Sequence, residues 1–121
     1  MFMKRMSIII FLLILSNMSV AINLNFLNES APAFHFTDDD FKIFLATVQN
    51  ALNDKKDGEQ LVWKNDKTGH AGLIKPLNTI IENGTSCRTA LIFNRANNKK
   101  ATTRYKFCKQ PDGEWKISPG K

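Results

Sequence analysis

The stretch Thr85 to Gln110, TSCRTALIFNRANNKKATTRYKFCKQ, predicts a β-hairpin around which the rest of the chain is arranged. An Asn-Asn pair tolerates the positive φ of a tight turn, so Asn97 and Asn98 are placed at the tip. Counting outward from this tip puts Cys87 directly opposite Cys108. Neighbours at a non-hydrogen-bonded position have the Cβ separation that a disulfide requires. We therefore predict a Cys87–Cys108 disulfide; the alternative is two free, buried thiols.

The start of the chain has the composition of an export signal. Lys4 and Arg5 precede the apolar run Ile8 to Leu15, and Ser19-Val20-Ala21 offers small residues at a cleavage site. We interpret residues 1–21 as a signal peptide; the alternative is an uncleaved anchor, for which the apolar run is short. Export predicts a location in the periplasm, the outer membrane or the cell surface, where disulfides persist.

The remaining residues are enough for one small domain. Residues 22–36 show no sustained period and are interpreted as a flexible leader, and residues 37–118 as the single domain.

Charge is distributed unevenly along the chain. From Thr85 to Lys121 there are nine Lys or Arg against two Asp or Glu, whereas from Ile22 to Gly84 there are six against nine. The C-terminal third therefore carries the positive field.

A helix is predicted from Thr37 to Asn53. Thr37 can cap its first turn, Asp38 to Asp40 complement the positive end of the helix dipole, and Phe36 with Phe41 suits a hydrophobic staple. The alternative for the three aspartates is a divalent-cation cluster, which is disfavoured because consecutive helical residues point in different directions. The predicted buried face consists of Phe41, Phe44, Leu45, Val48 and Leu52.

After the helix, short strand patterns alternate with turn residues. The predicted strands outside the hairpin are Gln60 to Asn65, His70 to Lys75, Leu77 to Ile81 and Trp115 to Ser118, with Pro76 at an edge or bulge. Turns are expected at the glycines between them. The predicted fold class is α+β, with one N-terminal helix packed on an antiparallel meander of about five strands and a hairpin clasped by the disulfide.

Several of these residues form a pattern seen in a known family. Trp63-x-Asn65, Thr68-Gly69-x-x-Gly72, Pro76, Cys87-Arg88, Cys108 and Asp112-Gly113-x-Trp115 together resemble the C-terminal domain of the rickettsial-type outer-membrane surface antigens. The resemblance extends from about Phe41 to Ile117. It implies an envelope location and antigenicity, and it implies no catalytic residues.

The basic residues of the hairpin are the candidate binding residues, for an anionic envelope component or another envelope protein. They are Arg88, Arg95, Lys99, Lys100, Arg104 and Lys106. The alternative is that they keep an exposed sheet soluble and discourage edge pairing. For Arg88 in particular, pairing with an acidic residue such as Asp112 or Glu114 is favoured over anion binding. Nucleic acid is not expected as a partner, because export separates the chain from it.

The sequence offers no pattern for catalysis, a metal or a cofactor. His35 and His70 are its only histidines, and no zinc signature, nucleophile elbow or phosphate loop is present. We therefore expect a non-catalytic structural or binding module of the cell envelope. The alternative is a small secreted inhibitor or effector that docks on a foreign protein.

Overall fold

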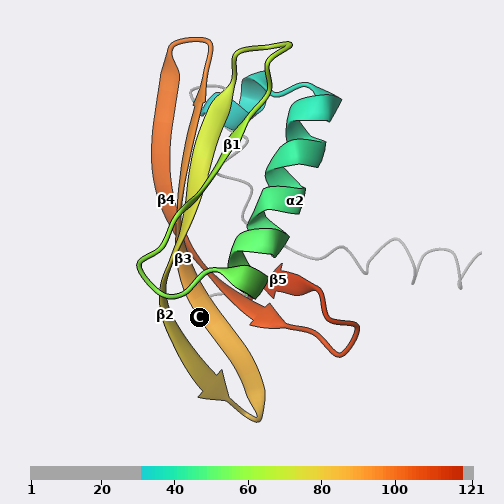
Figure 1. Cartoon of the computed structure of the whole chain (residues 1–121), viewed down its shortest axis with the longest axis vertical. Coiled ribbons are helices and arrows are strands. Elements are labelled where there is room, and N and C mark those ends of the chain that lie inside the picture. Colours follow the sequence, from blue (N-terminus) through green and yellow to red (C-terminus); the bar gives the residue numbers. More distant parts are fainter. Residues whose placement is uncertain (1–30, 119–121) are drawn as a thin grey trace, which may run out of the picture.

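The computed structural model describes residues 31–118; the predicted signal peptide and residues 22–30 lie outside this range. One helix lies along one side of a sheet of five antiparallel strands in the order β1-β2-β3-β4-β5 (Figure 1). The α+β meander predicted from the sequence is confirmed. The elements are η2 (Pro32–His35), α2 (Asp38–Asp54), β1 (Leu61–Lys64), β2 (Ala71–Glu82), β3 (Thr85–Ala96), β4 (Lys99–Lys109) and β5 (Trp115–Ile117).

The hairpin of β3 and β4 has the predicted register. Asn97 and Asn98 both adopt positive φ, 49° and 64°, which bends the chain back in two residues. Cys87 therefore lies opposite Cys108, with Cα atoms 4.0 Å apart, and the two are joined by the predicted disulfide. Closing a loop of this length stabilises the fold by about 3 kcal/mol in the chain-entropy account.

The start of α2 is fixed by a reciprocal cap. The Thr37 hydroxyl accepts a hydrogen bond from the Asp40 N–H, and the Asp40 carboxylate accepts one from the Thr37 N–H. Phe36 packs against Phe41 with ring centroids 5.3 Å apart, as the staple requires. Residues 31–36, which the sequence suggested were the end of a leader, instead place η2 and Phe36 against the domain, and Pro32 and Ala33 are buried.

The buried face of α2 contains three of the five predicted residues, Phe44, Val48 and Leu52, while Phe41 is half-buried. Leu45 is 57% exposed, so its assignment to the core is wrong. Spacings of three and four from Phe41 fit both Phe44 and Leu45. In the structure the helix is rotated so that Phe44 and Thr47 face the sheet and Leu45 does not. The Thr47 hydroxyl can be buried because it donates to the Ile43 carbonyl oxygen.

The core lies between α2 and one face of the sheet. It combines the helical residues Phe44, Val48, Ala51 and Leu52 with the strand residues Trp63, Ile74, Ala90, Ile92, Phe107 and Trp115. Trp63 and Trp115, the two tryptophans of the sequence, are both buried. The segments predicted on either side of Pro76 form one strand, β2, whose register shifts between Pro76 and Asn78. The predicted bulge at this proline is therefore confirmed.

A glycine near the start of β2 allows a hydrogen bond to cross that strand. Trp63 on β1 and Asn94 on β3 both lie opposite Gly72, and the indole Nε1–H donates to Asn94 Oδ1 over a distance of 3.1 Å. A Cβ at position 72 would lie 2.5 Å from each of these two side-chain atoms and would overlap the carbonyl oxygen of Phe93. Only glycine fits this place without a shift of the backbone.

We predict that Gly72→Ala destabilises the domain by about 1–3 kcal/mol or more, because the methyl group must displace the β3 backbone or break the buried hydrogen bond. Urea unfolding followed by tryptophan fluorescence measures the change. Asn78→Ala, at an exposed position of the same strand, is the control and should leave the unfolding midpoint almost unchanged. Equal midpoints for Gly72→Ala and the wild type would show that the crossing is not tightly packed.

Candidate functional site

The sheet face turned away from α2 carries most of the candidate binding residues. Ala90 and Ile92 are in the core, so the alternation of a strand places Leu91 and Phe93 on the opposite face. Pairing then adds Arg104 opposite Leu91. We call this surface the open basic face. Its basic side chains, assigned by the same register, include Lys64, Lys75, Arg95, Lys100, Arg104 and Lys106.

An apolar row crosses the open basic face. Val62, Leu73 and Phe93 are successive neighbours across β1, β2 and β3. Val62 is 60% exposed, and the other two side chains are half-buried. The next row along the strands contains Lys75, Leu91 and Arg104, so apolar and cationic groups are mixed over the surface. Such a surface suits a partner that offers both anionic groups and apolar contact.

Many cations of the open basic face lack an acidic partner. Within residues 31–118, Lys106 is paired with Glu82 and Lys64 with Asp66, the latter at 3.5 Å. In the same range no ion pair involves Lys75, Arg95, Lys100 or Arg104. The face therefore has an uncompensated positive field that can attract anions.

The six candidate residues are distributed over three environments. Arg104 and Lys106 share the open basic face, as the register predicted, and Arg95 and Lys100 extend it to the hairpin tip. Lys99 pairs with Ala96, which is buried, and so belongs to the other side of the tip. Arg88 also lies on the helix side, where it is buried.

Arg88 closes the C-terminal end of α2. Its guanidinium donates to the Leu52 carbonyl oxygen at 2.6 Å, to Thr79 Oγ1 at 2.9 Å and to Asp57 Oδ1 at 2.9 Å. A carbonyl in the last helical turn lacks a helical partner, so a cation here satisfies it and opposes the helix dipole. The hydrogen bond from Arg88, supported by one from Thr79, lowers the pKa of Asp57.

The preference for an ion pair at Arg88 is therefore confirmed, but the suggested partners Asp112 and Glu114 are wrong. Asp57 follows the helix and approaches Arg88 through the chain reversal after α2. Because all three guanidinium nitrogens donate to groups inside the domain, Arg88 does not contribute to the open basic face.

A buried polar cluster that sequence reasoning missed lies at the other end of α2. Asp40 is fully buried, and its carboxylate accepts hydrogen bonds from Asn65 Nδ2 at 2.8 Å and from Thr68 Oγ1 at 2.8 Å. His70 Nδ1 lies 2.7 Å from Asp40 Oδ2, and His70 Nε2 lies 3.1 Å from Asn97 Oδ1. The cluster joins the helix start, the β1–β2 turn and the tip of the β3–β4 hairpin.

Two hydrogen-bonding arrangements are compatible with the two partners of His70. A neutral imidazole carries a single N–H, whereas both ring nitrogens here face side-chain oxygens. The arrangement therefore requires either an imidazolium or an Asn97 amide turned to present its nitrogen. In the first case Asp40 and His70 form a buried ion pair.

Sequence reasoning assigned Asp40 only to the helix start. Its place in the first helical turn is confirmed, and its carboxylate also accepts a hydrogen bond from the Thr37 N–H, but the partners Asn65, Thr68 and His70 are 25 to 30 residues away along the chain. A polar Asn, Thr and His close together in a turn was the available signal. It did not point to position 40, because nothing in the local pattern shows which element the turn faces.

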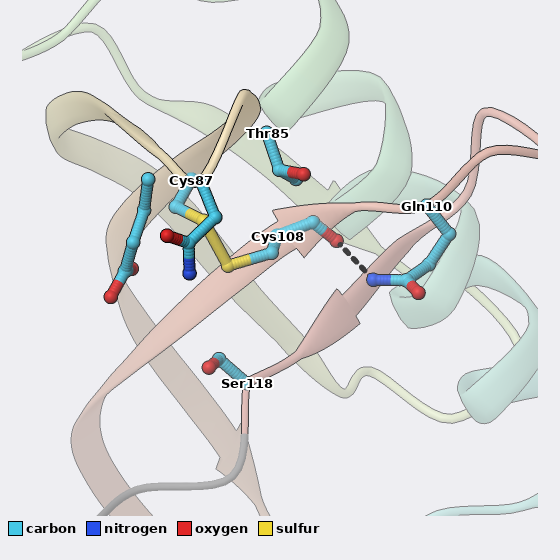
Figure 2. A pocket seen from close by; sticks show the side chains of 7 residues that line it. Thr85, Cys87, Cys108, Gln110 and Ser118 are labelled. Carbon is cyan, nitrogen blue, oxygen red and sulfur yellow. Dashed lines mark hydrogen bonds between the residues drawn. A yellow bond between two sulfur atoms is a disulfide. The ribbon is translucent and has the colours of Figure 1, made fainter.

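A hollow also lies around the disulfide, on the open basic face (Figure 2). Glu82, Thr85, Gln110 and Ser118 contribute to its lining, and Gln110 Nε2 donates to the Cys108 carbonyl oxygen at 3.0 Å. Glu82 and the two cysteine sulfurs lie within 4.8 Å of one another. While the disulfide is intact, this group offers no thiolate to a metal ion.

The fold and this surface define a small disulfide-bonded α+β domain with a charged sheet face opposite α2. In sequence, the chain is similar to the 17 kDa surface antigen of Rickettsia prowazekii (strain Madrid E), with 28% identity over 81 residues. The aligned part covers 66% of this chain and 51% of the relative, so the chain spans about half the length of the relative that it matches.

No protein-family profile matches the chain, and no solved structure matches it. Within residues 31–118 there is no helix with the length and hydropathy needed to cross a membrane.

The Asp40 cluster predicts an acid-sensitive fold. Burial raises the pKa of Asp40, but the hydrogen bonds from Thr37, His70, Thr68 and Asn65 outweigh it and lower the pKa from 3.8 to about 2. A carboxyl with a lowered folded-state pKa contributes stability that is present above its unfolded-state pKa and is lost as the pH falls toward its folded-state pKa. The contribution is about 2 kcal/mol, lost between about pH 5 and pH 2.

We expect Asp40→Asn to unfold more easily than the wild type at pH 7 and to lose less stability between pH 5 and pH 2. Thermal or urea unfolding across this range measures both effects. Asp38→Asn removes an exposed carboxylate from the same helical turn and should preserve the wild-type pH profile. An unchanged acid profile for Asp40→Asn would exclude Asp40 as the group responsible.

Proposed function

We propose that this chain is a non-catalytic, envelope-associated protein whose open basic face binds an anionic surface of the cell envelope. The observation that carries the proposal is a set of cations on one sheet face, including Lys75, Arg95 and Arg104, that form no ion pair within residues 31–118 and surround a partly exposed apolar row. The similarity to a surface antigen supports the envelope association.

The composition of the face favours a lipid or glycolipid surface with anionic headgroups as the partner. Phosphate groups would meet the lysines and arginines, while Val62 and its apolar neighbours would contact the less polar layer beneath them. A polyanion without an apolar part would leave this row exposed to water. Nucleic acid is not proposed as a partner, because the sequence favours export.

The chemistry of the buried cluster supports a non-catalytic role. Asp40 and His70 are a pair that some hydrolases use, but the nearby Thr68 hydroxyl donates to Asp40 and not to His70. The imidazole side chain is 11% exposed, and its second nitrogen is engaged by Asn97. The cluster is therefore arranged to hold three segments together.

A second function, docking on a foreign protein as a secreted inhibitor or effector, is favoured by one observation. At the end of the β2–β3 hairpin, Ile80 is 48% and Ile81 is 72% exposed. This hairpin extends beyond the end of α2 (Figure 1). Accumulation of the protein in the growth medium, with none retained by membranes, would favour this second function.

We expect the purified protein to co-sediment with phosphatidylcholine vesicles that contain phosphatidylglycerol, and to do so less as salt is raised. The Debye length falls from about 30 Å at 0.01 M to about 8 Å at physiological ionic strength, which screens exposed charges. Lys75→Ser/Arg104→Ser should weaken binding by about tenfold or more, because each cation near an anionic surface is worth about 1 kcal/mol.

Lys42→Ser/Lys56→Ser is the matched control, since it removes the same charge from exposed positions on α2 and the loop that follows. This control should bind almost as well as the wild type. Equal loss in the two double variants would mean that net charge alone attracts the protein, and no loss in either would refute the open basic face as the binding surface.

A further inference from the structure

One end of the sheet carries a second hollow, which shares Arg95 and Lys100 with the open basic face. It lies between the β1–β2 turn and the β3–β4 turn, and Thr68, His70, Arg95, Asn97, Asn98 and Lys100 contribute to its lining. The two turns are far apart in sequence and are connected by the His70–Asn97 contact. The hollow is thus a product of the tertiary fold.

The charges around this hollow favour an anion. Arg95 and Lys100 are direct cross-strand neighbours, both are exposed, and neither forms an ion pair within residues 31–118. The neighbouring carboxylates are engaged elsewhere, since Asp40 is buried in its hydrogen-bonded cluster and Asp66 faces Lys64. Of the residues that the structure describes, no acidic one contributes to the lining.

The walls are held in place by hydrogen bonds below the surface. His70 contacts Asp40 with one ring nitrogen and Asn97 with the other. The backbone N–H of His70 donates to Thr68 Oγ1 at 3.1 Å, and the backbone N–H of Gly69 donates to the Asn65 carbonyl oxygen at 2.7 Å. Both turns are therefore ordered before any ligand arrives, which reduces the entropy lost on binding.

We propose that this hollow is a binding site for a phosphate group. The planar guanidinium of Arg95 can bind two oxygens of a tetrahedral oxyanion, Lys100 adds a compact charge, and the Asn98 amide adds a neutral donor. His70 and Asn97 are positioning residues that set the separation of the turns. The inference deepens the proposed function, because a lipid headgroup or a free phosphate would present the same chemistry to the site.

The test is a titration of the purified protein with inorganic phosphate, observed through backbone amide resonances in NMR spectra. Saturable shifts are expected at 68–70 and 95–100 and not along α2, while chloride at equal ionic strength should not reproduce them. Arg95→Gln/Lys100→Gln should weaken the apparent affinity for phosphate by about tenfold or more. Lys42→Gln/Lys56→Gln removes the same charge from exposed positions on α2 and the loop that follows, outside both the hollow and the open basic face, and should preserve it.

Shifts that do not saturate, that chloride reproduces or that persist in Arg95→Gln/Lys100→Gln would overturn the site. The same spectra show whether each variant remains folded, so loss of the fold cannot be mistaken for loss of binding. Vesicle binding separates the two sources. Saturable phosphate binding without vesicle binding would retain this site for free phosphate and refute vesicle binding by the open basic face. Vesicle binding without phosphate shifts would retain the open basic face as the binding surface and refute the phosphate site.

Discussion

The hydrogen bond from Trp63 to Asn94 across Gly72 is the constraint on which the rest of the structure depends. It buries an indole N–H and an amide oxygen in a core that is otherwise apolar, where an unmet partner would cost free energy. It also fixes β1, β2 and β3 in one register, because the two side chains meet only when both lie opposite the glycine. The Trp63 ring then contacts Phe36 and Phe44, so the position of α2 follows from the same crossing.

The two ends of α2 show how the domain accommodates charge on its closed side. At the N-terminal end Asp40 is buried with neighbours that all donate to it, and at the C-terminal end Arg88 is buried with acceptors from three segments. Removing one partner from either group would weaken the hydrogen bonding of a buried charge, which is costly. On the other side of the sheet, by contrast, Arg95, Lys100 and Arg104 are exposed. The charged groups on the helix side are thus satisfied internally, whereas these three cations form no ion pair within residues 31–118.

Much of the fold could be predicted from local sequence because its main determinants are local. The hairpin register follows from two asparagines at the tip, the helix start from Thr37 and Asp40, and the bulge from Pro76. Leu45 was misassigned because a spacing of three or four leaves the helix rotation ambiguous, and only packing on the sheet resolves it. The partner of Arg88 could not be found in the same way, since Asp57 is brought to it by the reversal after α2.

The candidate site was only partly predictable for a similar reason. Sequence showed a basic hairpin, but the apolar row and the contribution of Lys75 emerge when β1 and β2 are aligned beside it. The Asp40–His70 cluster joins segments about thirty residues apart and leaves no periodic signal. It supports the hollow at the hairpin tip, so an apparently structural contact determines the geometry of one end of the proposed binding surface.

We propose that the protein binds an anionic surface through one face of its sheet. The most direct measurement is paramagnetic relaxation in NMR spectra of the protein bound to phosphatidylglycerol-containing vesicles that carry a spin label at the headgroup. Side chains of the open basic face, observed through the methyl groups of Val62, Leu73 and Leu91, should broaden strongly, whereas Val48 and Leu52 on the helix side should broaden little. Uniform broadening over both sets, or stronger broadening on the helix side, would contradict the account.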